Sequence, residues 1–106
     1  MNTPLLKQNK KTNLQSKRLS LKEKFADPSF IINEISNTIK DGDFASITDL
    51  ISAYVSNSKN YKSQDDFALA IGTTRQTLHR MFAHENVSLT VFFNALEKIY
   101  EDTQED

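Results

Sequence analysis

The sequence predicts an all-α fold, a bundle of five helices preceded by a flexible basic N-terminal arm. Only two glycines and two prolines occur among the 106 residues, whereas a meander of short strands needs turn residues about every 8–12 positions. Apolar residues recur at spacings of three and four, as on one face of a helix, and no segment alternates as a strand does. The length allows one domain, expected at residues 27–100 between the arm (1–26) and an acidic tail (101–106).

The helix ends are predicted from residues that commonly begin and terminate helices. In chain order, the first residues of capping motifs are Asp27, Ser63, Thr73 and Ser88, and Asp43 is expected to start the second helix. Pro28 suits the first helical position, and Gly42 and Gly72 are expected to end the helices that precede them. The expected helices cover residues 28–41, 43–57, 64–71, 74–82 and 88–100, with a polar loop at 56–62 and another at 83–87.

The net charge of −1 is the sum of four blocks of alternating sign. Residues 1–24 carry +6, residues 25–58 carry −4, residues 59–84 carry +2 and residues 85–106 carry −5. Such blocks act as separate electrostatic surfaces. The near-neutral total therefore does not argue against a nucleic-acid partner for the basic blocks.

The basic arm allows more than one arrangement. It has few large apolar groups to offset the entropy of ordering, which favours a solvated chain. Leu14, Leu21 and Phe25, however, share a helical spacing. The arm could therefore also form a short helix on contact with a partner or pack on the domain.

Residues 63–82 carry the most specific functional signal. Two helices of about eight residues joined by a turn have the dimensions of a helix-turn-helix, and Gly72 supplies a residue that tolerates positive φ in the turn. Leu78 and Met81 can close the angle between the helices with apolar contacts. The start of the second helix is rich in arginine, glutamine and threonine, which bind base edges and phosphates in the major groove.

The stretch SQDDFALAIGTTRQTL, residues 63–78, resembles the helix-turn-helix of the Xre/Cro/phage-repressor family, in which S/T-Q-x-x-[LF]-A-x-x-[IV]-G precedes the recognition helix. More narrowly, residues 27–100 resemble the addiction module antidote (HigA-like antitoxin) family. This narrower resemblance rests on IKDGD at 39–43, RQTLHRMF at 75–82 and NVSLTVFFNAL at 86–96. Val87 stands where that pattern has proline, and Leu69 and Tyr100 stand where polar residues or glycine are usual. An exposed Leu69 would indicate a partner surface.

The resemblance implies a phage-repressor-like helix-turn-helix bundle that acts as a sequence-specific transcriptional repressor. It implies a cytoplasmic homodimer that binds an inverted-repeat operator in double-stranded DNA. It further implies the antitoxin of a type II toxin–antitoxin module, which represses its own operon and neutralises a RelE-like toxin. The residues expected to contact DNA are Gln64, Thr74, Arg75, Gln76, Thr77, His79 and Arg80. Gln64 would cap its helix and bind phosphate, and Thr74 would lie near the DNA backbone. Arg75, Gln76 and Thr77 would face the bases, and Arg80 would contact a base or a phosphate one turn further along.

Two other functions stay open at this point. The same fold could be a protein-interaction module that docks a basic partner on its acidic blocks without reading DNA. It could also be a phage regulator with no toxin partner. Binding of DNA fragments would separate the first alternative from a repressor, and a small basic reading frame beside the gene would favour the antitoxin.

Catalysis is not expected, because there is no cysteine, glycine-rich phosphate loop or nucleophile–base pattern. His79 and His84 are five residues apart, off the i, i+4 spacing of ligands on one helical face, so neither a metal nor a cofactor is predicted. His79 could contact phosphate instead. No apolar run approaches the ~18 residues of a membrane span or the ~7–15 of a secretory signal. A soluble cytoplasmic protein with no membrane partner is therefore expected.

Overall fold

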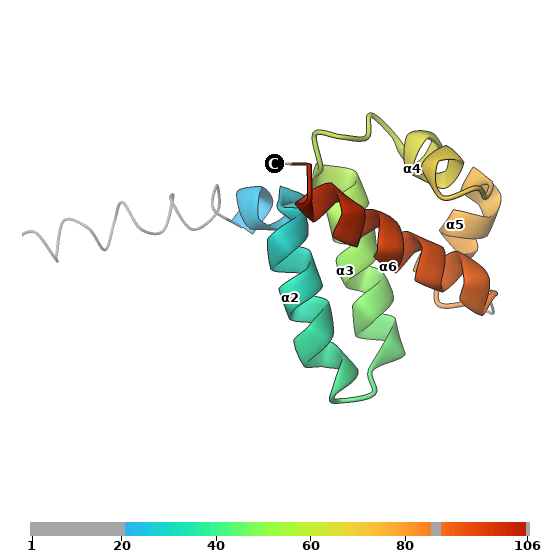
Figure 1. Cartoon of the computed structure of the whole chain (residues 1–106). Coiled ribbons are helices and arrows are strands. Elements are labelled where there is room, and N and C mark those ends of the chain that lie inside the picture. The colour runs from blue at the N-terminus through green and yellow to red at the C-terminus, as the bar shows by residue number, and fades with distance from the viewer. Residues whose placement is uncertain (1–20, 86–87, 106) are drawn as a thin grey trace, which may run out of the picture.

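The computed structural model describes residues 21–85 and 88–105, and throughout these residues the regular structure is helical, without strands (Figure 1). The predicted all-α class is confirmed for this part of the chain. The helices are α2 (Pro28–Ile39), α3 (Phe44–Asn57), α4 (Gln64–Ala70), α5 (Arg75–Phe82) and α6 (Leu89–Thr103). Residues 21–26 form a further short helical segment. Among the helices described, none is long and apolar enough to cross a bilayer.

Helices α2 and α3 form a hairpin, and α6 lies across it in the view of Figure 1. The cap predicted at the start of α2 is present, since Asp27 accepts a hydrogen bond from the Ser29 amide at 3.0 Å. Asp43, expected to start the second helix, is the N-cap of α3 and accepts from the Ser46 amide at 3.1 Å. Gly42 makes the turn between the helices with φ +69°. The fully buried side chains that join α2–α6 into one core include Ile31, Ile51, Tyr54, Phe67, Leu78, Met81 and Ile99.

Two predicted capping boxes do not form. Ser63 precedes α4 but makes no side-chain cap hydrogen bond, and the Asp66 carboxylate instead accepts from the Lys62 amide at 2.9 Å. The cap of α5 is Thr74 rather than Thr73. Thr73 cannot begin α5 because its amide donates to the Ala68 carbonyl at 2.9 Å and so belongs to the end of α4.

Helical structure continues on both sides of residues 27–100, the range expected for the domain. Residues 21–26 are helical, and the Phe25 ring meets the Phe30 ring edge-on with centroids 6.1 Å apart. This part of the predicted arm therefore packs on the domain, whereas the rest of the arm, residues 1–20 with Leu14, lies outside the described residues. Helix α6 continues to Thr103 because Asp102, placed in the tail by the sequence analysis, is on its buried face.

Candidate nucleic-acid interface

Helices α4 and α5 are joined by a four-residue turn that contains Gly72. The Gly72 amide donates to the Leu69 carbonyl at 3.1 Å, and the Thr73 amide donates to the Ala68 carbonyl at 2.9 Å. This pair of bonds is the Schellman pattern, in which the residue after the C-cap adopts a left-handed conformation. Gly72 has φ +75°, so it fills the role predicted for it. The turn ends α4 and redirects the chain into α5.

One face of α5 packs into the molecule. Leu78 and Met81 are fully buried, and Ala68 and Ile71 on the α4 side are buried as well. Leu78 and Met81 are three residues apart and so lie on the same side of the helix. This packing fixes which side of α5 faces outward.

The outward face of α5 carries four of the seven predicted DNA-contacting residues: Arg75, Gln76, His79 and Arg80, all of them exposed. They form two pairs at i, i+4 spacing, Arg75 with His79 and Gln76 with Arg80, which places them on one surface. Arginine offers five N–H donors, and glutamine offers both a donor and an acceptor. These are the side chains that form bidentate hydrogen bonds with guanine and adenine edges in the major groove.

Thr74 and Thr77 form the start of α5 rather than part of its outward face. The Thr74 hydroxyl oxygen accepts a hydrogen bond from the Thr77 amide at 3.1 Å, and the Thr74 hydroxyl donates to the half-buried Thr77 hydroxyl at 3.0 Å. Because the Thr77 hydroxyl oxygen is the acceptor in this second bond, the Thr77 hydroxyl proton is left to donate to an external acceptor. Amides in the first turn of a helix also favour an anion such as a phosphate.

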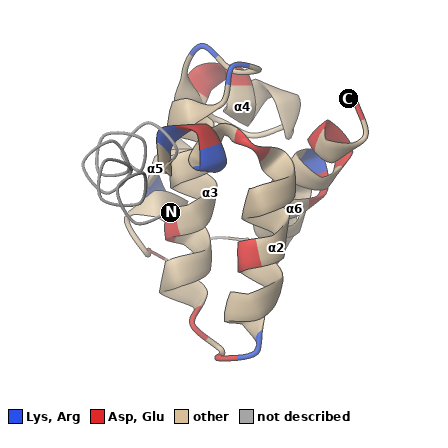
Figure 2. Ribbon diagram, turned by 90° about the vertical axis from the view of Figure 1, so that its left-hand side faces the viewer, with Lys and Arg blue, Asp and Glu red and all other residues tan. Residues whose placement is uncertain are grey.

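Acidic residues of α4 lie next to this surface. Arg75 Nη1 is 3.9 Å from Asp65 Oδ2, and both side chains are exposed. An exposed ion pair at this distance is worth about 0–1 kcal/mol, so Arg75 can leave it at little cost. The acidic residues of α4, visible in Figure 2, therefore lie beside the basic start of α5.

Gln64 does not have the capping role predicted for it. It is the first residue of α4, it is half-buried, and its side chain makes no hydrogen bond among the described residues. Its amide is accordingly free to bind phosphate, the other half of the prediction.

The two histidines have separate surroundings. His79 lies on the outward face of α5, whereas His84 Nε2 lies 2.9 Å from Asp49 Oδ1 on α3. His84 has φ +63° and follows the last turn of α5, where the Glu85 amide donates to the Arg80 carbonyl at 2.9 Å. The described residues contain no group of three or more side chains that could hold a metal ion.

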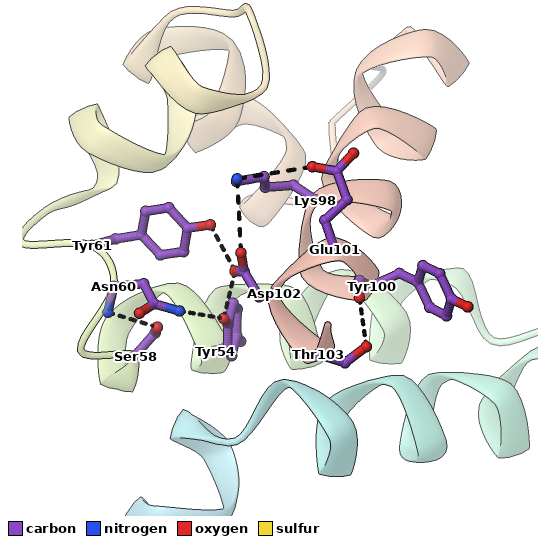
Figure 3. A network of polar contacts seen from close by, with 9 residues as sticks. All are labelled: Tyr54, Ser58, Asn60, Tyr61, Lys98, Tyr100, Glu101, Asp102 and Thr103. Carbon is purple, nitrogen blue, oxygen red and sulfur yellow. Dashed lines mark hydrogen bonds and ion pairs between the residues drawn. The ribbon is translucent and has the colours of Figure 1, made fainter. Parts of the chain in front are cut away.

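A buried carboxylate, which the sequence analysis missed as a structural element, holds α6 in place (Figure 3). Asp102 Oδ2 accepts hydrogen bonds from the Tyr54 hydroxyl at 2.6 Å and from the Tyr61 hydroxyl at 2.7 Å. Lys98 Nζ lies 3.8 Å from Asp102 Oδ1. Burial, and then the hydrogen bond to Asp102, raises the pKa of Tyr54 to about 12, and the same two causes raise the pKa of Tyr61.

This network bears on the site through Tyr61, which stands in the loop that leads into α4. The Tyr61 ring also meets the Phe67 ring of α4 edge-on, with centroids 5.0 Å apart. The position of Asp102 could have been foreseen, because Phe92, Ala95, Ile99 and Asp102 share the spacing of one helical face. Through the network, α3, α6 and the loop before α4 form one connected unit, called the frame, which supports α4 and α5.

No protein-family model matches the chain, and neither a curated protein nor a solved structure matches it.

Proposed function

We propose that the chain is a sequence-specific DNA-binding regulator of the helix-turn-helix type, with α5 as its recognition helix. The observation that carries this proposal is the orientation of α5. Leu78 and Met81 anchor one side in the core, and the opposite side presents arginine, glutamine and histidine to solvent. The left-handed turn at Gly72 also matches the turn that the family resemblance requires.

DNA recognition divides between the two ends of this surface. Arg75 and Gln76, in the first turn of α5, face the base edges, where bidentate contacts give specificity. Thr74 and Gln64, each at the start of a helix, bind phosphates and set the position of the protein on the duplex. Two copies of the chain bind half-sites about 34 Å apart in an inverted repeat. Repression follows from occupancy of the operator.

Selection from a pool of random duplexes tests this function. The full chain is incubated with the pool at fixed low salt, and the bound duplexes are amplified over several rounds and sequenced. The proposal predicts enrichment of one inverted repeat, because two identical recognition helices read both half-sites. A bound pool as random as the starting pool would leave only sequence-independent phosphate binding and would overturn the proposal.

A second function is favoured by the charge on α6. Glu97, Glu101 and Glu105 are exposed and four residues apart, so the first two lie on one side of the helix and the third follows its end. This side suits a basic protein, and a RelE-like toxin, as the family resemblance implies, is the partner we propose for it. The chain would then be an antitoxin whose DNA-binding and partner-binding surfaces lie on different helices.

Co-purification tests the second function. The chain is expressed together with the small basic protein encoded beside it, and the Glu97→Lys/Glu101→Lys variant is compared with the native chain. We expect the native chain to retain the basic protein and the variant to release it. Retention by both forms would exclude this side of α6 as the docking surface without affecting the DNA-binding proposal.

A further inference from the structure

Helix α6 carries an apolar stripe of four side chains, of which three are largely exposed and the fourth, Leu96, is half-buried against the core. Leu89, Phe93, Leu96 and Tyr100 follow the spacing i, i+4, i+7 and i+11, which places them along one side of the helix for about 16 Å. Leu89 is 66% exposed, Phe93 58% and Tyr100 56%. The stripe adjoins the core, because the Phe93 ring meets the Phe92 ring with centroids 5.6 Å apart.

The stripe continues onto the start of α3. Phe44 is 41% exposed, and its ring centroid lies 4.7 Å from that of Phe92. Phe44 and Phe93 thus flank the same buried ring. The surface formed by Phe44, Leu89, Phe93, Leu96 and Tyr100 is called the α6 apolar face below.

We infer that the α6 apolar face is the surface through which two copies of this chain pair. This inference deepens the proposed function. Pairing itself does not depend on DNA binding, and only the effect of pairing on operator affinity rests on the proposed function. The first argument is area. An aromatic side chain buries about 150–250 Å², so the exposed parts of these side chains amount to roughly 400 Å² per copy. A patch of roughly 300–600 Å² on a monomer is often functional.

Two such patches would remove about 800 Å² of apolar surface from water. Since about 65% of a homodimer interface is apolar, the whole interface would cover about 1,200 Å². That is the lower end of the range for specific and stable interfaces. The area is therefore enough for a dimer that forms and dissociates reversibly.

The second argument is charge. In a two-fold dimer the same patch faces itself, so a patch with a charge of one sign at its centre would repel its copy. Residues 89–96 contain no charged side chain, and the acidic residues of α6 begin at Glu97. Figure 2 shows the charged part of α6 toward its C-terminal end. The centre of the patch is thus compatible with itself, and the acidic residues lie toward its edge.

The same charges disfavour other occupants. The exposed Glu97 and Glu101 would repel the phosphates of DNA. A helix that binds at a membrane surface carries lysine and arginine beside its apolar face, whereas the single basic residue of α6, Lys98, is paired with Glu101 and Asp102. A second copy of the chain meets neither obstacle.

Analytical ultracentrifugation of the full chain tests the inference without DNA. The native chain is compared with Leu89→Ser, Phe93→Ser and the double variant, and circular dichroism checks that each is helical. Leu69→Ser is the matched control. Leu69 is 80% exposed, as the partner surface expected at this residue requires, but it lies on α4 and outside the α6 apolar face, so pairing through α6 does not involve it. Leu89→Ser decides the matter if Phe93→Ser fails to fold, since Leu89 is the first residue of α6 and largely exposed.

The native chain is expected to dimerise reversibly. Each substitution occurs twice in a dimer and should raise the dissociation constant about tenfold or more, while Leu69→Ser leaves it unchanged. The inference is overturned if the native chain is monomeric at all concentrations, or if the α6 variants dimerise as the native chain does. Binding to the selected operator separates failure of the pairing inference from failure of the proposed function. If an α6 variant loses affinity for the full operator but keeps its affinity for a half-site, the dimer is broken and DNA recognition is intact. If the chain forms dimers that bind neither the full site nor a half-site, the proposed DNA recognition is contradicted.

Discussion

Replacing Asp102 with alanine should destabilise the fold strongly, although the residue lies only four positions from the end of the chain. Asp102 is 3% exposed, and its Oδ2 atom is the shared acceptor of two tyrosine hydroxyls. Without the carboxylate, the hydroxyls of Tyr54 and Tyr61 are left in the interior without this acceptor. Each buried polar group that loses its partner costs about 1–3 kcal/mol.

The carboxylate is itself desolvated in the native chain, so its removal returns part of that cost. The net loss should be about 3 kcal/mol of the free energy of unfolding. For a domain of this size, 1 kcal/mol lowers the melting temperature by about 4–8 °C, so the variant should melt at least about 12 °C lower. Urea unfolding followed by circular dichroism measures the loss directly.

Glu101→Ala provides the matched control for Asp102→Ala. Glu101 is adjacent in sequence, carries the same charge and is exposed, with a contact to Lys98 at 3.9 Å. Its loss should cost no more than about 0.5 kcal/mol. The reasoning would be refuted if both variants lost the same stability, or if a double-mutant cycle of Asp102→Ala with Tyr54→Phe gave no coupling energy.

Three further predictions concern the same frame and the turn before α5. The folded chain raises the pKa of Tyr54 to about 12, whereas an unfolded tyrosine has a pKa near 10. The free energy of unfolding should therefore be intact below pH about 10 and fall by about 2 kcal/mol as the pH rises toward 12. Chemical unfolding at a series of pH values measures this, and a constant midpoint would contradict it. Gly72→Ala and Gly42→Ala should each lower the free energy of unfolding by about 1–2 kcal/mol, because both glycines have positive φ and an added Cβ meets nothing within 4 Å. Thermal melting should show similar losses for the two variants, and a loss at only one position would mean that backbone conformation is not the cause. Thr74→Ala should cost about 1 kcal/mol by removing the N-cap of α5, whereas Thr74→Ser should retain it; equal stability of the two variants would contradict the capping role.

The turn at Gly72 and the face of α5 were predictable because their determinants are local. A glycine after an apolar helix end, followed by a threonine cap and the two inward residues Leu78 and Met81, specifies the turn and the orientation within about ten residues. The capping boxes were predicted less well. Thr73 could either begin α5 or close the end of α4, and its amide in fact bonds to the end of α4. Residue spacing alone does not reveal which of the two forms.

The frame behind α5 was not predicted because its contacts are distant in the sequence. Asp102 bonds to Tyr54 across 48 positions and to Tyr61 across 41. The acidic composition around Asp102 indicates a solvated tail, whereas its place in the helical register indicates burial. Register decided the outcome, since two tyrosine hydroxyls were available to satisfy the carboxylate.

The central claim is that α5 reads base sequence, and the most direct measurement compares two double variants on two duplexes. Fluorescence anisotropy at one salt concentration gives the affinity for the selected operator and for random DNA. Arg75→Ala/Gln76→Ala removes a cation and an amide from α5, and Asn37→Ala/Lys40→Ala removes the same two groups from the exposed end of α2.

Each bidentate base contact contributes about 1–3 kcal/mol of discrimination. The α5 variant should therefore lower the ratio of operator to random affinity by about 100-fold or more, and the α2 variant should leave that ratio at the native value. An undiminished ratio in the α5 variant, with operator binding otherwise intact, would contradict the claim that α5 is the recognition helix.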